Sequence, residues 1–469
     1  MRLFRLLPIL LLLLPIRCAN PPAPPNLLFI ITDDQRFDMM GNMTPYLQTP
    51  VMDRLAREGV RFERAFVTTP ICAASRATLL SGVVERTHRF TFNTPALDAS
   101  FTDASYAALL RDAGYRTAHI GKFGVVTAEG ATERMFSVFE PLDRNPYFKK
   151  QADGTERHLT DIEADRSIAF LESNPAGTPF ALTLSFNAPH AEDSDPRQYI
   201  WPAAMDTYYT DLEIPTPPLS DPAFLASQPA FLRADTLMNR YRWRWRFDTP
   251  EKASAMTKGY FRMISGVDAA MGRVLDALER LGLADNTVVI MMGDNGYFIG
   301  ERGYAGKWLP HDLSLRVPLL IYDPRTPAAA GRRPEAMALN IDIAPTLLDL
   351  AGVPAPASMQ GRSLAPFVRG PEPATWRTDF FLEHLMEHPQ IVKHEGVRNE
   401  RFKYARYFQE EPVYEELYDL VADPMETRNL VDDPAFHDTL LTLRSRCDAL
   451  RDSYGGPYRP HTGEAAMRP

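Results

Sequence analysis

Short apolar runs alternate along the chain with longer amphipathic stretches, and several runs stop at polar residues. Asn26–Thr32 is apolar and ends at Asp33-Asp34. Short runs that are apolar at nearly every position are typical of parallel strands buried on both faces. Strands are therefore predicted at four places: Asn26–Thr32, Tyr115–Ile120, Phe180–Phe186 and Thr287–Met292.

Helices are predicted between these runs. Thr49-Pro50 provides a cap and first residue for a helix that Gly59 closes. Asp103–Asp112 forms a second helix, and Thr257–Leu281 forms a long amphipathic one. Val60–Phe66 returns to a strand-like pattern. This alternation predicts an α/β fold with a mostly parallel central sheet that helices cover on both faces.

Two segments depart from the alternation. Residues from Pro196 to Pro250 are rich in proline and aromatic residues, which indicates either a binding loop or a cap packed on the core. Beyond Pro371-Glu-Pro373, short alternating runs and a last helix predict a smaller antiparallel α+β subdomain. The expected organisation is a signal peptide over residues 1–19, a catalytic domain over 25–370 and a C-terminal subdomain over 374–460.

The N-terminus has the pattern of an export signal. Arg2 and Arg5 precede an almost wholly apolar run, Leu6–Ile16, which is shorter than the roughly 20 residues that span a bilayer. A cleaved signal peptide and a secreted or periplasmic location are predicted, with no transmembrane span. Cys18 is an alternative site for lipid attachment, although the charged Arg17 before it disfavours that reading.

Composition narrows the class of protein. The 469 residues are 45% hydrophobic and 24% charged, which suits a full globular core. The net charge of −9 disfavours a nucleic-acid-binding protein. Three cysteines are too few for a disulfide scaffold. Cys447 lies in an apolar-periodic helix and is expected to be buried, which leaves Cys72 as the cysteine of interest.

Oxygen-bearing side chains follow two of the predicted strands. The carboxyl ends of parallel strands lie at one edge of a sheet, where ligands bind. Hard oxygen donors without a thiolate favour Ca²⁺ or Mg²⁺ over a zinc-type ion, although either pair taken alone is more typical of a turn than of a metal site. The candidate metal ligands are Asp33, Asp34, Asp294 and Asn295.

Cys72 stands at the start of a predicted helix. Pro70 precedes this stretch and Gly82 ends it, so Cys72 lies in the first turn. The free N–H groups and the helix dipole favour an anion there. Arg76 lies four residues on, on the same face. The arrangement suits a tetrahedral anion; the alternative is a buried cysteine with a surface arginine.

Cys72-Ala-Ala-Ser-Arg76 resembles the signature of the type I, formylglycine-dependent sulfatases of the alkaline-phosphatase-like superfamily, with Ala74 in its Pro/Ala position. Nearly the whole chain shares the resemblance, and the order of the motifs makes it specific. Its other elements are Asn26–Gln35, Gly293-Asp-Asn-Gly296, Gly306-Lys307, Ser314-Leu-Arg-Val-Pro318, Glu416-Leu-Tyr-Asp-Leu420 and Asp423-Pro424.

The resemblance implies that a separate maturing enzyme oxidises Cys72 to formylglycine, which is hydrated to a diol. One diol oxygen attacks sulfur, and the second hydroxyl then expels sulfate. Ca²⁺, or Mg²⁺ as the alternative, binds the diol at position 72. The implied roles are as follows: metal ligands Asp33, Asp34, Asp294 and Asn295; diol and metal-site geometry, Arg76; sulfate binding, Lys122 and Lys307; and protonation of the departing alcohol, His190.

One position departs from the family's pattern. Gly124 occupies the place of a histidine that contacts the diol in the family. His88, His311 and a metal-bound water are the alternatives for its role. His311 and Arg316 lie near Lys307 in sequence and are candidate substrate-binding residues.

The expected function is hydrolysis of sulfate esters, of a sulfated carbohydrate or of an aryl sulfate. One alternative is a phosphonate or phosphodiester hydrolase of the same superfamily. The other is a binding protein that has lost its chemistry, which the missing histidine motivates.

Overall fold

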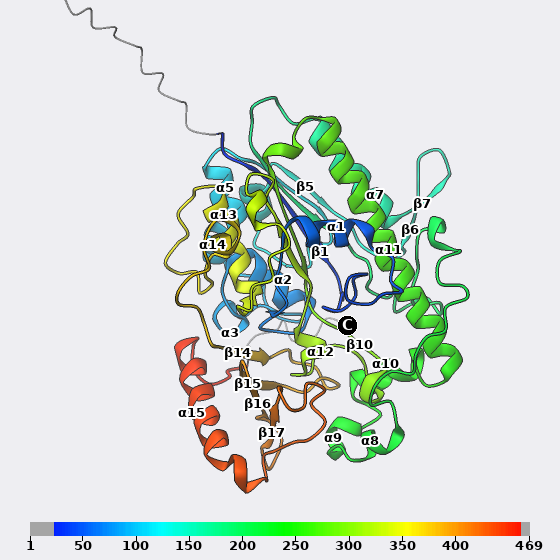
Figure 1. Ribbon diagram of the computed structural model, residues 1–469, viewed down its shortest axis with the longest axis vertical. Helices are drawn as coiled ribbons and strands as arrows, with labels where there is room; N and C mark the ends of the chain where they lie inside the picture. Colours follow the sequence, from blue (N-terminus) through cyan, green and yellow to red (C-terminus); the bar gives the residue numbers. More distant parts are fainter. Residues whose placement is uncertain (1–22, 461–469) are drawn as a thin grey trace, which may run out of the picture.

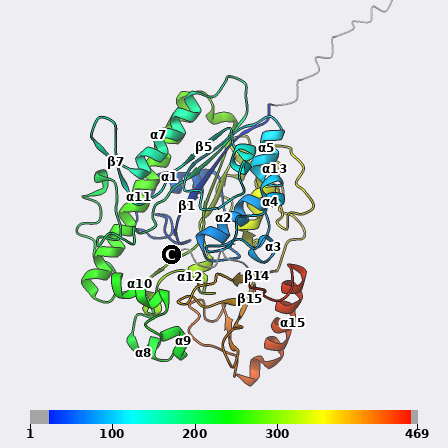
Figure 2. The same ribbon diagram turned by 180° about the vertical axis from the view of Figure 1, so that it is seen from behind.

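A computed structural model describes residues 23–460. The predicted signal peptide and Cys18 lie outside the described residues. Within that range, no helix has the length and apolar character needed to cross a membrane. Figures 1 and 2 show the central sheet between two layers of helices, with a smaller sheet below it.

The central sheet confirms the predicted fold class. Its seven strands run in the order β2-β12-β9-β1-β8-β4-β5. The five strands from β9 to β5 are mutually parallel, and β12 and β2 add an antiparallel edge. The strands are β1 (Asn26–Thr32), β2 (Val60–Arg61), β4 (Arg116–Gly121), β5 (Val138–Pro141), β8 (Phe180–Ser185), β9 (Thr287–Gly293) and β12 (Leu319–Tyr322).

Alternate side chains of β1 enter two separate cores, because successive strand residues face opposite sides of a sheet. Phe29 packs under α2 (Cys72–Ser81), α5 (Tyr106–Asp112), α13 (Ile343–Leu350) and α14 (Ala365–Arg369). Leu28 and Ile30 pack under α1 (Pro50–Glu58), α7 (Leu159–Glu172) and α11 (Pro250–Arg280). Burial on both faces explains why β1 is an unbroken apolar run.

The helices follow the sequence signals, with shifts that capping explains. Helix α1 begins after Thr49 as expected, but the Asp268 carboxylate caps it by accepting bonds from the Val51 and Met52 amides at 3.1 and 2.8 Å. Ser105 caps α5, so that helix begins later than expected and α4 (Ala99–Asp103) is separate. Thr249 caps α11, which therefore begins before Thr257.

Several elements were not apparent from the sequence pattern. Helix α7 has buried residues around much of its circumference, so it lacks a clear amphipathic stripe. Val60–Phe66 divides into β2 and β3 (Ala65–Phe66). The remaining short elements before residue 370 are α3 (Glu85–His88), α6 (Ala131–Met135), β6 (Phe148–Lys150), β7 (Glu156–His158), β10 (Phe298–Ile299), β11 (Ala305–Gly306), α12 (Asp312–Leu315) and β13 (Ala338–Leu339).

The proline- and aromatic-rich insertion is a folded cap. It contains α8 (Pro222–Ala226), α9 (Ala230–Arg233) and α10 (Met238–Arg246). Tyr199 and Tyr209 are buried in the core beneath α11. Helix α10 packs against β11, directly before Lys307. The cap alternative therefore describes this segment, and α10 brings it to the edge of the site.

The C-terminal sheet is antiparallel, as expected. Strands β14 (Asp379–His384), β15 (His394–Asn399), β16 (Phe402–Tyr407) and β17 (Tyr414–Asp419) pair in sequence order. Helix α15 (His437–Ser453) covers the sheet and buries Cys447 completely, which confirms the expectation for that residue. The boundary predicted at Pro371-Glu-Pro373 lies between α14 and β14 and stays a prediction.

Arg86, on α3, joins the C-terminal sheet to the part of the chain that carries the central sheet. Its guanidinium pairs with Glu383 and Glu395, at 2.8 Å in each case, and donates to the Gly456 carbonyl at 2.8 Å. Its backbone amide donates to the second Glu383 oxygen. Arg86 and both carboxylates are buried. Buried charges are tolerated when every charge has a partner, so this cluster makes the junction sensitive to single substitutions.

Arg86→Ala is expected to destabilise the protein by about 3–5 kcal/mol, since it leaves Glu383 buried without its cation. Urea unfolding followed by circular dichroism measures the change. Arg57→Ala is the control, because the Arg57 side chain is 68% exposed and pairs with the neighbouring Glu58; it is expected to change stability by less than about 0.5 kcal/mol. Equal effects from the two substitutions would contradict the role assigned to Arg86.

Candidate active site

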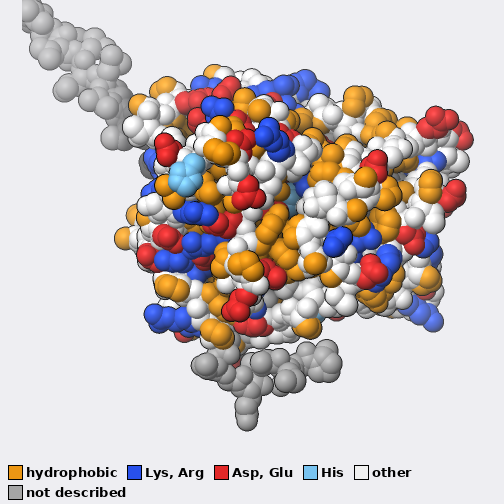
Figure 3. Space-filling model, turned by 90° about the horizontal axis from the view of Figure 1, so that it is seen from below, with side chains coloured by type: hydrophobic (Ala, Val, Ile, Leu, Met, Phe, Trp, Pro, Cys, Tyr) orange, Lys and Arg blue, Asp and Glu red, His pale blue; other side chains and the backbone are white. Residues whose placement is uncertain are grey.

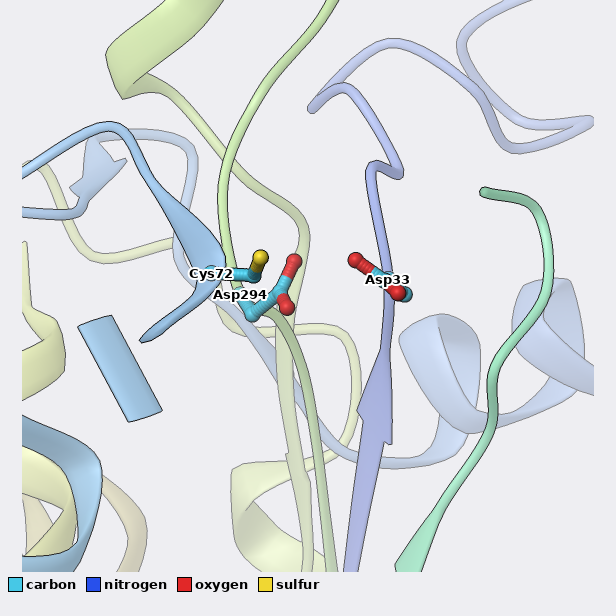
Figure 4. Close-up of side chains that lie close together, drawn as sticks. All are labelled: Asp33, Cys72 and Asp294. Carbon is cyan, nitrogen blue, oxygen red and sulfur yellow. The ribbon is translucent and has the colours of Figure 1, made fainter. Parts of the chain in front are cut away.

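Two parallel strands and one helix deliver the central residues of the site. Asp33 follows β1, Asp294 follows the neighbouring β9, and Cys72 is the first residue of α2. One ligand atom from each of these side chains lies within 4.8 Å of the others. Figure 4 shows the thiol of Cys72 and the Asp294 carboxylate directed toward Asp33. All three residues are buried.

Helix α2 presents an open N-terminus at Cys72. Ile71 before it is extended, and within residues 23–460 no side chain caps the first turn. Gly82 ends the helix in the left-handed conformation, with φ of 71°. Unpaired N–H groups and the helix dipole favour negative charge beside Cys72. The geometry at Cys72 therefore favours an anionic ligand.

Arg76 braces this helix against the sheet. Its Nε donates to Asp294 Oδ2 at 2.8 Å, and its Nη1 donates to the Lys122 carbonyl and Ser185 Oγ at 2.7 and 2.6 Å. These partners lie at the ends of β9, β4 and β8. One buried guanidinium thus fixes α2 relative to three strand ends.

Two lysines balance the aspartates. Lys122 pairs with Asp33 and Lys307 pairs with Asp34. Burial would raise the pKa of Asp33, but Lys122 and Lys307 outweigh it and hold this pKa well below its ordinary value. Burial would lower the pKa of Lys307, yet Asp34 keeps it above its ordinary value. The shifts keep the Asp33 carboxylate and the Lys307 amine charged in spite of their burial.

Three buried oxygens in the site lack hydrogen-bond donors. Within the described part of the chain, Asp33 Oδ1, Asp34 Oδ2 and Asn295 Oδ1 have no hydrogen-bond partner. Burial and the nearby charge of Asp33 raise the pKa of Asp294 to about 6, which reflects the crowding of carboxylates. Buried oxygens without donors are costly unless something else satisfies them. This all-oxygen set fits a hard divalent cation.

His190 is held in one tautomer beside Asp34. Its Nδ1 lies 2.6 Å from the Ala191 carbonyl, which can only accept, so Nδ1 carries the proton. Nε2 faces Asp34 Oδ2 at 3.5 Å. Burial, followed by Arg144 and Lys307, lowers the pKa of His190 well below its ordinary value. The imidazole is therefore neutral and aims Nε2 into the site.

The predicted residues do not all gather here. His311 packs against the rings of Phe298 and Tyr418, and among the described residues neither of its ring nitrogens has a hydrogen-bond partner. The Arg316 guanidinium stacks on Phe37 at 3.8 Å and donates to the Glu63 carbonyl. The geometry thus gives both residues packing partners outside the cluster, and their predicted substrate contacts remain untested.

His88 and His119 also have local partners that hold them away from the role of the histidine absent at Gly124. His88 Nε2 lies 3.1 Å from the Thr78 hydroxyl, and its Nδ1 accepts the Phe90 amide. His119, on β4, is surrounded by the rings of three phenylalanines. Neither histidine faces Cys72 through any of these contacts.

Gly124 leaves no room for a side chain. Its φ is 71°, and a β-carbon there would lie 2.9 Å from Arg76 Cδ. Only glycine adopts this conformation without strain. The backbone conformation of Gly124 and the nearby Arg76 side chain therefore exclude the histidine that the family has at this position.

Sequence reasoning missed three residues in contact with the site. Tyr260, on α11, donates from its hydroxyl to the Asp34 carbonyl at 2.6 Å. Ser185 accepts from Arg76 and could have been suspected as the last residue of a buried strand. Arg144 donates to the Ala191 carbonyl at 3.2 Å. No sequence pattern identified Tyr260 or Arg144.

The mostly parallel sheet, with acidic, amide and lysine side chains beside a cysteine-headed helix, defines a hydrolase of the alkaline-phosphatase-like superfamily. The sequence model of the family described as Sulfatase matches residues 25–353, and the chain belongs to that family of sulfuric ester hydrolases. A second model, described as N-sulphoglucosamine sulphohydrolase, C-terminal, matches residues 300–453.

Individual relatives agree with this assignment. The chain is 28% identical to an N-acetylglucosamine-6-O-sulfatase of Bacteroides thetaiotaomicron, over 88% of this chain and 84% of the relative. It resembles a structure solved with its substrate D-glucosamine-2-N,6-O-disulfate (25% identity, TM-score 0.77, 92% and 98% of the two chains). It also resembles the phosphonate monoester hydrolase of Agrobacterium radiobacter (26%, TM-score 0.78, 92% and 96%).

Chelation with EDTA is expected to lower the melting temperature, because an ion present at 100 times its Kd stabilises the folded state by about 2.7 kcal/mol. Differential scanning calorimetry with added Ca²⁺ or Mg²⁺ measures recovery and ranks the two ions. Asp33→Ala is the matched variant, in which chelation is expected to have little effect. An EDTA-treated wild type that melts unchanged would contradict the metal site.

Gly124→His is expected to lower activity rather than restore a missing function, because its β-carbon would displace Arg76. The left-handed backbone adds about 1–3 kcal/mol of strain. The control is Gly130→His, where φ is 78° but nothing lies within 4 Å of an added β-carbon. Sulfate release and melting temperature are measured for both variants. Higher activity in Gly124→His than in the wild type would contradict this account.

Proposed function

We propose that the protein hydrolyses sulfate esters of a sulfated carbohydrate, with a formylglycine derived from Cys72 and a divalent cation, Ca²⁺ in the first instance. The observation that carries the proposal is the position of Cys72. It begins a helix with an uncapped N-terminus and faces Asp33 and Asp294 across a space lined by unpartnered oxygens. A reactive group placed there meets both a metal site and a helix dipole.

The residues for the cation are Asp33, Asp34, Asp294 and Asn295, and the oxygens without partners supply its ligands. When bound, the cation lowers the cost of negative charge at position 72. Formylglycine, once hydrated, supplies the oxygen nucleophile. A maturing enzyme has to reach Cys72 before the chain folds, because Cys72 is buried in the folded protein.

Lys122 and Lys307 are the residues proposed to bind the oxygens of the ester sulfate. Each amine pairs with an aspartate proposed to bind the cation, so its charge lies at the site where the anion would bind. Arg76 keeps the geometry fixed through Asp294 rather than by touching the ester. Preorganised positive charge in a buried site stabilises the developing charge of a transition state.

His190 is proposed to protonate the departing alcohol from Nε2. The Ala191 carbonyl binds Nδ1–H and so directs Nε2 toward the reaction. Burial, with a further contribution from the neighbouring cations, lowers the pKa of His190 and keeps the imidazole neutral in the free protein. An anionic ester bound beside it reduces that effect and favours the protonated form that a general acid needs.

A sulfated carbohydrate is the favoured substrate class because two of the three named relatives act on or bind sulfated glucosamine derivatives. Export through the predicted signal peptide is part of this proposal, and it would bring the enzyme to sulfated polymers outside the cytoplasm. An aryl sulfate is the second substrate to test, since the core motif does not distinguish the two.

A phosphonate or phosphodiester hydrolase is the second candidate function. The similarity to a phosphonate monoester hydrolase over most of both chains favours it. Turnover of phenyl phosphonate esters and of sulfated sugars by the same preparation decides between them. Faster phosphonate turnover would reverse the order.

The chain is to be expressed together with a formylglycine-generating enzyme and its peptides analysed by mass spectrometry. The Cys72 peptide is expected to carry an aldehyde, and the Cys447 peptide serves as an internal control that stays a thiol. Cys72→Ala is expected to lower sulfate release by at least about 1,000-fold, because the nucleophile is lost.

Two results would contradict the proposal. An unmodified thiol at Cys72, in a host that matures a known formylglycine enzyme, would favour a binding protein without catalysis. Release of sulfate from the panel of sugars and aryl sulfates that Cys72→Ala leaves unchanged would require a different nucleophile.

A further inference from the structure

Three arginines converge on one carboxylate beside the active site. Arg242 pairs with Asp193 at 2.8 Å, Arg246 pairs with the other oxygen, and Arg144 lies 4.0 Å away. One carboxylate can neutralise only one guanidinium. The cluster therefore carries two positive charges in excess.

Arg246 has a structural task. Its side chain is fully buried, and it also donates to Gln198 Oε1 at 2.8 Å and to the Tyr297 hydroxyl at 2.6 Å. These bonds hold the Arg246 guanidinium in place against Asp193. Arg144 and Arg242 differ, since their side chains keep 20% and 15% exposure. Within residues 23–460, Asp193 is the only carboxylate in salt-bridge range of either.

Arg144 lies beside His190, the residue proposed to protonate the departing alcohol. Its Nε and His190 Nδ1 donate to the same Ala191 carbonyl, at 3.2 and 2.6 Å. Burial would lower the pKa of Arg144, but nearby negative groups, Asp33 first, raise it. The guanidinium is therefore next to the proposed acid and close to the reacting centre.

Arg242 extends this positive region along the cap. Its Cζ lies 5.1 Å from the centre of the Trp308 ring, and Lys307 Nζ lies 5.9 Å from the same ring. Trp308 has a φ of 78°, which is rare for a bulky residue. Its amide donates to the Pro70 carbonyl, two residues before Cys72. The Trp308 indole is thus held in place, and both Lys307 and Arg242 lie near its ring.

We propose that Arg144 and Arg242, held in place by Asp193, form a second anion-binding subsite that recognises a carboxylate or a second sulfate on the alcohol portion of the substrate. Lys122 and Lys307 serve the ester sulfate, whereas Arg144 shares the Ala191 carbonyl with His190, the proposed acid, and Arg242 pairs with the same Asp193 as Arg144. Guanidinium groups match the planar or trigonal oxygens of such anions. This inference rests on the proposed function and adds a specificity to it.

The face of the molecule in Figure 3 does not form one broad basic area. Basic and acidic side chains are interspersed over the face shown in Figure 3. A dianionic substrate is therefore selected by the local pair of arginines rather than by a broad electrostatic field.

The test compares kcat/KM for matched substrates. Glucosamine bearing N- and 6-O-sulfates is compared with N-acetylglucosamine 6-sulfate, and a sulfated hexuronate with its methyl ester. The wild type is expected to prefer the dianion of at least one pair, and the preferred pair identifies the second anion. Arg144→Gln and Arg242→Gln are each expected to lower that ratio by about 10- to 100-fold, since each removes a hydrogen bond to a charged group.

Arg197→Gln is the matched control, because Arg197 is 68% exposed and pairs with Asp195 on the same loop; its ratio is expected to stay that of the wild type. Using a ratio cancels any general loss of activity. If the glutamine variants do not fold, Arg144→Lys and Arg242→Lys keep the charge and are expected to lower the ratio less.

Three outcomes are distinct. A ratio that falls in the arginine variants and not in the control supports the subsite. A wild type without preference, or variants that lose both substrates of a pair equally, overturns it while sulfate release still supports the proposed function. A wild type that releases sulfate from no substrate overturns the proposed function and this inference with it.

Discussion

Buried negative charge at one edge of the central sheet is the constraint on which the rest of the site depends. Asp33, Asp34 and Asp294 are almost inaccessible to solvent. Carboxylates in such surroundings are costly unless cations or donors compensate them. Lys122, Lys307 and Arg76 provide that compensation, but they leave oxygens unsatisfied. The buried carboxylates make the fold dependent on these three basic side chains. The oxygens that remain unsatisfied suit a metal ion, and the basic side chains suit an anionic ester.

The brace formed by Arg76 connects this chemistry to the fold. It joins the N-terminal part of α2 to three strand ends, so Cys72 cannot move independently of the sheet. Gly124 passes close to the same side chain, which explains why a residue with a β-carbon is not accommodated there. The cap adds a second layer, since α10 supplies Arg242 to the Trp308 ring beside Lys307.

Much of the site could be predicted because it lies at strand ends. Asp33 and Asp294 directly follow apolar runs, and parallel pairing of β1 with β9 brings their carboxylates together. Cys72 and Arg76 were predictable from helix geometry. His311 and Arg316 were predicted to bind substrate because they lie near Lys307 in sequence; their side chains contact Tyr418 and Phe37, and a substrate contact stays a prediction. Sequence distance does not predict where a side chain points within an irregular loop.

The sequence by itself determined the strands of the parallel sheet, the open helix start at Cys72 and the family, because each depends on local pattern and on the order of motifs. Tertiary structure alone decided that Asp268 caps α1 and that Tyr260 binds the Asp34 carbonyl. It also decided that Arg144, Asp193 and Arg242 meet beside His190. These contacts join residues far apart in the chain, and their geometry is set by the packing of whole elements.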